Sequence, residues 1–193
     1  MQMQYKSFID QDVHDAAICL RQGGVICYPT DTIWGLGCDA TNSDAVSKIY
    51  KIKGRDTSKS MLILVGDIEA VRNYVDWLPD IAIDLFNTTT EPLTIILQGA
   101  KNLAHNLPAS VKSIGVRIVK HAFCTPLFNV FGKPIVSTSA NFSGQIPPAS
   151  FGEIDEKLLD TVDYVVKANR TQVPGKSSKI IMITSDNQIK QIR

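Results

Sequence analysis

The sequence predicts an α/β fold built on a sheet that is not purely parallel. Two observations carry this prediction. Short apolar runs bounded by Gly or Pro, which are typical of buried strands, are interspersed with helical patterns in a mixed order. The chain has 193 residues, 44% hydrophobic and 20% charged, which is an ordinary globular balance. We therefore expect one domain over residues 1–193, with a core over about residues 9–183.

Helices are expected where apolar residues recur on one face and capping residues flank them. In the first, Val13, Ala16, Ala17 and Leu20 share a face and Gly23-Gly24 follows. Asn42 or Ser43 caps the second, and Gly54 ends it. The expected helices, in chain order, cover residues 12–21, 43–53, 67–75, 79–86, 124–131 and 150–159.

Strands are expected at the short apolar runs, and loops at the polar, Gly-rich or Pro-rich segments between them. The expected strands cover residues 25–28, 61–65, 93–97, 114–119, 134–137, 162–166 and 179–183. The principal loops cover residues 29–37, 98–113 and 141–148.

Charge and cysteine content exclude several classes of protein. A net charge of +1 does not favour wrapping of a long nucleic acid, although a local basic patch stays open. No run approaches the ~20 apolar residues of a membrane span, and residues 1–6 lack an apolar signal core, so we expect a cytoplasmic protein with no membrane contact. The four cysteines form no C-x-x-C pair, which favours reduced structural thiols and no protein-bound metal.

A polar loop over residues 28–37 follows the first buried strand, where α/β folds place ligand loops. Thr30, Asp31 and Thr32 offer two hydroxyls and a carboxylate. The segment also fits a turn that is held by local side-chain hydrogen bonds.

Basic residues gather at the end of the second helix and just beyond it. Lys53, Arg55 and Lys59 suit an anionic ligand, with Arg as a forked phosphate donor. Without further context, a solvated basic face that complements the helix C-terminus is the better interpretation.

Two strand ends carry polar groups in otherwise apolar surroundings. Ser137-Thr138-Ser139-Ala140-Asn141 places small hydroxyl residues where a ligand can approach the backbone, or it forms a polar turn. Arg117 lies within an apolar run, so it needs a partner, either a ligand carboxylate or an Asp or Glu of the chain. No G-x-S-x-G motif is present, and no histidine is assigned a catalytic role.

The ordered set of segments resembles the YrdC/TsaC family of threonylcarbamoyl-AMP synthases. The matching pieces, in the order and spacing of that family, are residues 28–32 with 35–37, Lys53-Gly54-Arg55, Pro92-Leu93-Thr94, Gly115-Val116-Arg117 and Ser137–Asn141 with Ser143-Gly144.

The resemblance implies a twisted mixed sheet with flanking helices around a concave, positively lined cavity. It also implies a reaction in which L-threonine, bicarbonate and ATP with Mg²⁺ give threonylcarbamoyl-AMP and pyrophosphate. A separate machinery then passes the threonylcarbamoyl group to an adenosine of tRNA.

The resemblance also assigns residues. Thr32, Arg117 and Ser139 correspond to threonine contacts, and Lys53 and Arg55 are the residues expected to act in catalysis. The expected ATP contacts are Lys53, Arg55, Lys59, Ser113, Ser137, Asn141, Ile146 and Ser178.

The sequence departs from the usual family pattern in several places: Asp56 replaces Pro, Thr89-Thr90-Glu91 replaces Trp-Pro-Gly, and Leu64 replaces a polar residue of some relatives. Two alternatives stay open. One is a YciO-like paralogue with the same fold and another activity, and the other is a non-catalytic RNA-binding module.

Overall fold

The computed structural model describes residues 2–59, 61–107, 112–171, 175, 177–184 and 186–193, with side chains from residue 8 onward. Within these residues a nine-stranded sheet has the order β7-β1-β2-β6-β3-β5-β4-β8-β9. The strands are β1 (Ile26–Tyr28), β2 (Gly35–Gly37), β3 (Leu62–Val65), β4 (Leu93–Gln98), β5 (Ser113–Ile118), β6 (Ile135–Ser139), β7 (Tyr164–Val165), β8 (Lys179–Ile183) and β9 (Ile189–Gln191).

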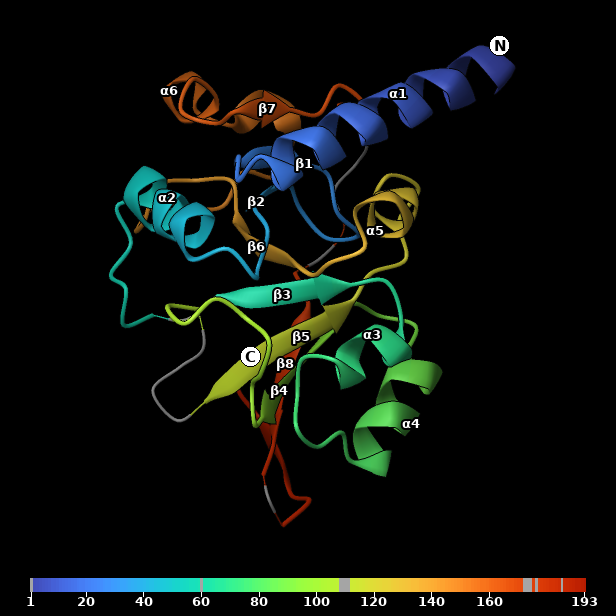
Figure 1. The fold of residues 1–193 in the computed structure, drawn as a ribbon, viewed down its shortest axis with the longest axis vertical. Coiled ribbons are helices and arrows are strands. Elements are labelled where there is room, and N and C mark those ends of the chain that lie inside the picture. The colour runs from blue at the N-terminus through green and yellow to red at the C-terminus, as the bar shows by residue number, and fades with distance from the viewer. Residues whose placement is uncertain (1, 60, 108–111, 172–174, 176, 185) are drawn as a thin grey trace.

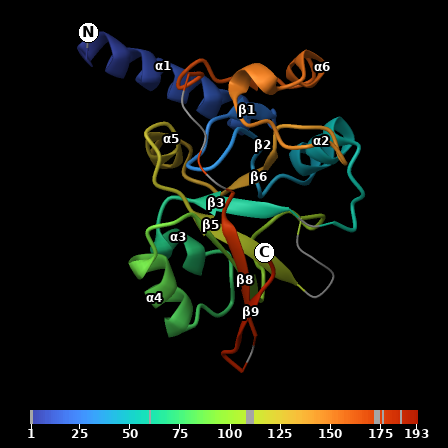
Figure 2. The same ribbon diagram turned by 180° about the vertical axis from the view of Figure 1, so that it is seen from behind.

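The sheet mixes parallel and antiparallel pairs, which confirms the predicted fold class. β1–β7, β3–β5 and β4–β8 are parallel, whereas the other neighbouring strands run antiparallel. The sheet is strongly twisted: β3 runs across the view while β8 and β9 run steeply past it (Figures 1 and 2). β6 joins the two parts of the sheet because it pairs with both β2 and β3.

Helices flank the sheet. They are α1 (Gln2–Arg21), α2 (Ser43–Lys53), α3 (Ile68–Arg72), α4 (Asp80–Thr88), α5 (Cys124–Phe131) and α6 (Glu156–Leu159), with a 3₁₀ turn at Phe151–Glu153. α1 packs against α5, and α3 and α4 lie together beside β3 and β5 (Figure 1). None of the described helices is long and apolar enough to cross a membrane.

The caps of α2 follow the sequence prediction. The Asn42 side chain accepts hydrogen bonds from the backbone N–H groups of Asp44 and Ala45, at 3.0 and 3.1 Å. Gly54 ends the helix in the left-handed conformation, with φ of 57°. These caps fix where the chain leaves the helix, and therefore where Arg55 stands.

Several predicted elements were wrong in extent. α1 begins at Gln2 rather than at residue 12, and its first half projects from the body of the molecule (Figure 1). Residues 150–159 form a 3₁₀ turn and a short helix, because Asp155 starts a new helix by accepting from the Lys157 N–H. α3 ends at Arg72 rather than at residue 75, and β7 has two residues rather than five.

Two strands were not predicted. Gly35–Gly37 was expected to be loop, but it forms β2, a buried strand between β1 and β6. A Cβ atom at Gly37 would lie 2.6 Å from a ring carbon of Tyr28 and 2.9 Å from the Val136 carbonyl oxygen, so only glycine fits there. β9, beyond the expected core, pairs with β8 at the sheet edge.

Candidate active site

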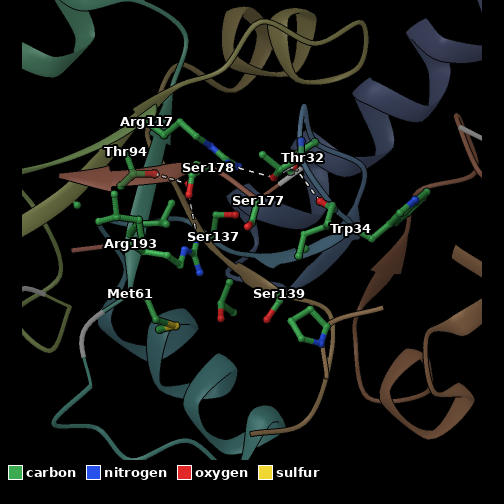
Figure 3. Close-up of a pocket in the computed structure, with 18 of the residues that line it drawn as sticks. Thr32, Trp34, Met61, Thr94, Arg117, Ser137, Ser139, Ser177, Ser178 and Arg193 are labelled. Atoms are coloured by element: carbon green, nitrogen blue, oxygen red, sulfur yellow. Dashed lines mark hydrogen bonds between the residues drawn. The ribbon is translucent and has the colours of Figure 1, made fainter. Parts of the chain in front are cut away.

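A cavity of about 860 Å³ is lined by β5 along its length, by the end of β6, by the loop after β1 and by the chain just before β8. This volume is typical of a small-molecule site. Side chains from β3, β4 and β5 contribute to its lining, as do the loop after β1, residues 147–149, Gly175, Ser177 and Ser178. Its described polar lining is mainly hydroxyl groups and guanidinium groups (Figure 3).

The structure brings seven of the predicted contact residues together around this cavity. They are Thr32, Arg55, Ser113, Arg117, Ser137, Ser139 and Ser178. Four others, namely Lys53, Lys59, Asn141 and Ile146, do not line it. Residues far apart in the sequence therefore share one site, and their assigned roles stay predictions.

Arg117 is a buried cation in the wall of the cavity. It lies on β5 opposite Leu64 of β3 and is 4% exposed. Its Nη1 donates to the Thr32 hydroxyl at 2.9 Å, and its Nη2 lies 3.4 Å from Asp31 Oδ1. Within the described residues its Nε has no hydrogen-bond partner. A buried guanidinium with an unused donor suits a ligand carboxylate.

Asp31 is the counter-charge of Arg117. Burial raises the pKa of the Asp31 carboxyl group, and the nearby Arg117 opposes that shift. Its Oδ1 accepts no hydrogen bond within the described part of the chain, despite the 3.4 Å approach of the guanidinium. The sequence left two partners open for Arg117, a chain carboxylate or a ligand. The structure supplies the first, and within the described residues the Arg117 Nε keeps no hydrogen-bond partner.

Lys53 lies behind the cavity wall. Its ammonium donates to the carbonyl oxygens of Ser139 and Asn141, at 2.5 and 2.6 Å, and the residue is 3% exposed. Burial, with a smaller effect from Arg55, lowers the pKa of Lys53 from 10.5 to about 8. Its own carbonyl oxygen accepts from the Ser143 N–H at 2.8 Å. Lys53 thus ties the end of α2 to the chain that follows β6.

Asn141 shapes the loop after β6. Its amide group donates to the carbonyl oxygens of Phe142 and Gln145, at 3.0 and 2.7 Å. Ile146, at the far side of this loop, is 90% exposed. Pro147, Pro148 and Ala149, which follow directly, line the cavity. The Asn141 side chain therefore sets the path of a segment that forms part of the wall.

The basic residues of α2 and of the segment after it lie in distinct environments. Lys48 donates to the Gly23 carbonyl oxygen at 2.9 Å, and Lys51 and Lys59 are exposed. Arg55 is half-buried, donates through Nε to the Lys59 carbonyl oxygen at 3.1 Å, and lines the cavity. Of these residues only Arg55 brings a charge to the cavity lining.

Two further cavity residues were not assigned roles from the sequence. Thr94 of β4 forms a 2.9 Å hydroxyl pair with Ser178, and Arg193 donates to the Ser178 carbonyl oxygen at 3.2 Å (Figure 3). Thr94 was noted within the Pro92-Leu93-Thr94 motif but given no contact. Arg193 reaches the cavity because β9 runs back along β8. β9 was not predicted from the sequence.

Comparison with known proteins shows likeness over most of the chain. The family model that describes Sua5, YciO and YrdC proteins as "Telomere recombination" matches residues 19–193. A threonylcarbamoyl-AMP synthase of Pseudoalteromonas translucida is 37% identical over 161 residues, which are 81% of this chain and 86% of that protein.

Solved structures resemble the fold closely. A variant of P. abyssi Sua5 superposes with a TM-score of 0.85 at 25% identity, over 94% of this chain and 55% of that longer one. E. coli YciO superposes with a TM-score of 0.81 at 27% identity, over 94% of this chain and 87% of that one.

Proposed function

The chain belongs to the Sua5/YciO/YrdC family, and on that premise we propose that it is a threonylcarbamoyl-AMP synthase. It converts L-threonine, bicarbonate and ATP to threonylcarbamoyl-AMP and pyrophosphate. Curated relatives at 32–37% identity carry the name of this activity. The observation that carries the proposal is one cavity that joins a buried guanidinium suited to a carboxylate with a second guanidinium and several hydroxyls suited to phosphates.

At one end of the cavity, Arg117 receives the threonine carboxylate. Its guanidinium group, which Thr32 holds through Nη1, is the donor for this contact. Ser139 also lines the cavity. The α-amino group of threonine is then directed into the cavity. There it adds to CO₂, which forms from bicarbonate by loss of water, and gives a carbamate with release of a proton.

The other predicted contacts that line the cavity hold the nucleotide. Arg55, Ser113, Ser137 and Ser178 line the cavity and present one cation and three hydroxyls to the phosphates. The carbamate oxygen attacks the α-phosphorus and the bond to pyrophosphate breaks. The chain assists by orienting the reactants and by offsetting the growing negative charge. Lys53 and Asn141 support this side from behind the wall.

Mg²⁺ fits this site as a companion of ATP. Mg²⁺ in nucleotide sites is commonly held by substrate phosphates and water with few protein carboxylates. No group of three metal-binding side chains occurs within the described residues, and the described lining supplies hydroxyls and guanidinium groups. Mg²⁺ would then neutralise part of the triphosphate charge.

The chemistry of the product indicates which partners the protein needs. Threonylcarbamoyl-AMP is a mixed anhydride, which water hydrolyses, so an enzyme that transfers the threonylcarbamoyl group to tRNA must take it up promptly. We place the protein in the cytoplasm, with that transfer machinery and tRNA as the partners of its product.

The product itself gives the direct test. Purified protein incubated with ATP, Mg²⁺, L-threonine and isotopically labelled bicarbonate should yield a nucleotide that carries the label and has the mass of threonylcarbamoyl-AMP. A YciO-like paralogue with another activity would yield no labelled nucleotide. An RNA-binding module would instead show RNA affinity that falls steeply with salt.

A further inference from the structure

Two hydroxyl groups meet in the wall of the cavity, from segments 84 positions apart in the chain. The Thr94 Oγ1 atom on β4 lies 2.9 Å from the Ser178 Oγ atom, just before β8. The two residues are 1% and 4% exposed, and both line the cavity. Figure 3 shows the pair on the side of the cavity that also holds Arg193. Neither hydroxyl makes another hydrogen bond within the described part of the chain.

The pair must leave one proton unused. Each hydroxyl has one proton to donate and can accept two hydrogen bonds. One proton forms the bond between the two oxygens, whichever residue donates it. The proton of the other residue then has no acceptor among the described residues. A buried donor without a partner is unfavourable, so the pair is set up to donate to something in the cavity.

The backbones of both residues are held in place by their neighbours. Thr94 lies within β4, where it is paired with Ile180 of β8. The Ser178 carbonyl oxygen accepts from the Arg193 guanidinium at 3.2 Å, and the next N–H group, that of Lys179, donates to the Pro92 carbonyl oxygen at 3.0 Å. The contact between the two hydroxyls therefore determines where the unused proton points.

We propose that Thr94 is a positioning residue that donates to Ser178, so that the Ser178 hydroxyl donates to an anionic phosphate oxygen of the bound nucleotide. The proposal rests on the proposed function. The guanidinium groups of Arg55 and Arg193 in the same lining favour an anion there. A hydroxyl that accepts one hydrogen bond becomes a better donor in the next, so Thr94 strengthens the contact that Ser178 makes.

Calorimetric titration with ATP and Mg²⁺ tests this relationship. Thr94→Val replaces the hydroxyl by a methyl group of the same shape and should raise the Kd for ATP by about fivefold. Thr94→Ser keeps the hydroxyl and should stay within about twofold of wild type. Ser178→Ala should weaken ATP binding at least as much as Thr94→Val. Adding Thr94→Val to Ser178→Ala should cause little further loss, because the two residues act through one contact.

The matched control is Thr161→Val. It removes a hydroxyl that donates to the Leu158 carbonyl oxygen at 2.7 Å, outside the cavity lining, and should leave the Kd for ATP unchanged. Thermal unfolding of each variant separates lost binding from lost folding. If Thr94→Val fails to fold, Thr94→Ala alone and combined with Ser178→Ala provides the same comparison.

Three results would overturn the positioning role. The first is wild-type affinity for ATP in Thr94→Val. The second is an equal increase in the Kd for ATP in Thr94→Ser and Thr94→Val. The third is a double variant whose increase in Kd equals the product of the two single increases. ATP binding with the expected pattern but no labelled product would contradict the proposed function and leave the positioning role standing. Wild-type protein that binds no ATP would contradict both.

Discussion

The Lys53 ammonium lies 2.6 Å from the carbonyl oxygen of Asn141 and joins α2 to the end of β6 through a buried charge. The bond links two residues that are 88 positions apart in the sequence, and both segments carry predicted nucleotide contacts. Lys53 therefore influences the site through the position of Ser139 and Asn141, and Arg55 follows two residues later.

The buried ammonium makes stability depend on pH. The pKa of Lys53 is about 8 in the folded chain and 10.5 when unperturbed, so between these values the unfolded state binds more protons. The free energy of unfolding should therefore rise with pH across this window for wild type relative to Lys53→Met. Urea denaturation of both proteins from neutral pH to about pH 10.5 measures the difference. A difference that stays constant over the window would show that the Lys53 pKa is not lowered.

Replacing Arg117 should affect threonine selectively. Arg117→Lys keeps the charge but cannot bond Thr32 and a carboxylate through one planar fork. The KM for threonine should rise by about 10-fold to 100-fold, as expected for charge-assisted hydrogen bonds, with a much smaller change for ATP. Initial rates with each substrate varied in turn give both values. Equal increases for threonine and ATP would mean that Arg117 does not mark the threonine end.

Arg55 should be essential for turnover. Arg55→Ala removes a guanidinium from the cavity lining and should lower kcat/KM for ATP by about 100-fold or more. Lys51→Ala is the matched control, since Lys51 is an exposed cation on the last turn of α2 and should tolerate the change. Circular dichroism checks that both variants are folded. Equal activity of Arg55→Ala and Lys51→Ala would move the phosphate site elsewhere.

Gly37 should resist any side chain. A Cβ atom there would approach the Ile135 Cγ2 atom to 2.8 Å and the Val136 carbonyl oxygen to 2.9 Å, between strands that cannot separate. Gly37→Ala should cost about 1–3 kcal/mol of unfolding free energy, as overpacked cores do. Gly152→Ala, where a Cβ atom would meet no heavy atom within 4 Å, serves as the control. Similar stability of the two variants would contradict the packing argument.

The sequence predicted the class of sheet and most elements, because strong apolar runs and caps mark them locally. β2 escaped prediction because Gly35-Leu36-Gly37 has no strand propensity, and its reason lies in the close approach of β1 and β6. The first half of α1 was also not predicted, although Tyr5, Phe8 and Ile9 stand at helical spacing. β2 depends on contacts between distant segments, which local patterns do not contain.

Part of the site was also predictable from local sequence patterns. Polar residues at strand ends, such as Thr32 and Ser137, pointed to the cavity from the sequence. Arg55 lines the cavity and Lys53 lies behind its wall. The sequence shows only two basic residues in one motif and does not tell them apart. Gly54 between them redirects the chain, and only the packing of α2 against the β6 end determines which cation is buried.

The central claim is that one cavity joins threonine, bicarbonate and ATP, and pyrophosphate release tests it most directly. Purified protein with ATP and Mg²⁺ is assayed with L-threonine and bicarbonate together, with each alone, and with L-serine in place of threonine. Pyrophosphate release is expected only when threonine and bicarbonate are both present, and serine should support less. Equal release with serine, or no release with any amino acid, would contradict the synthase assignment.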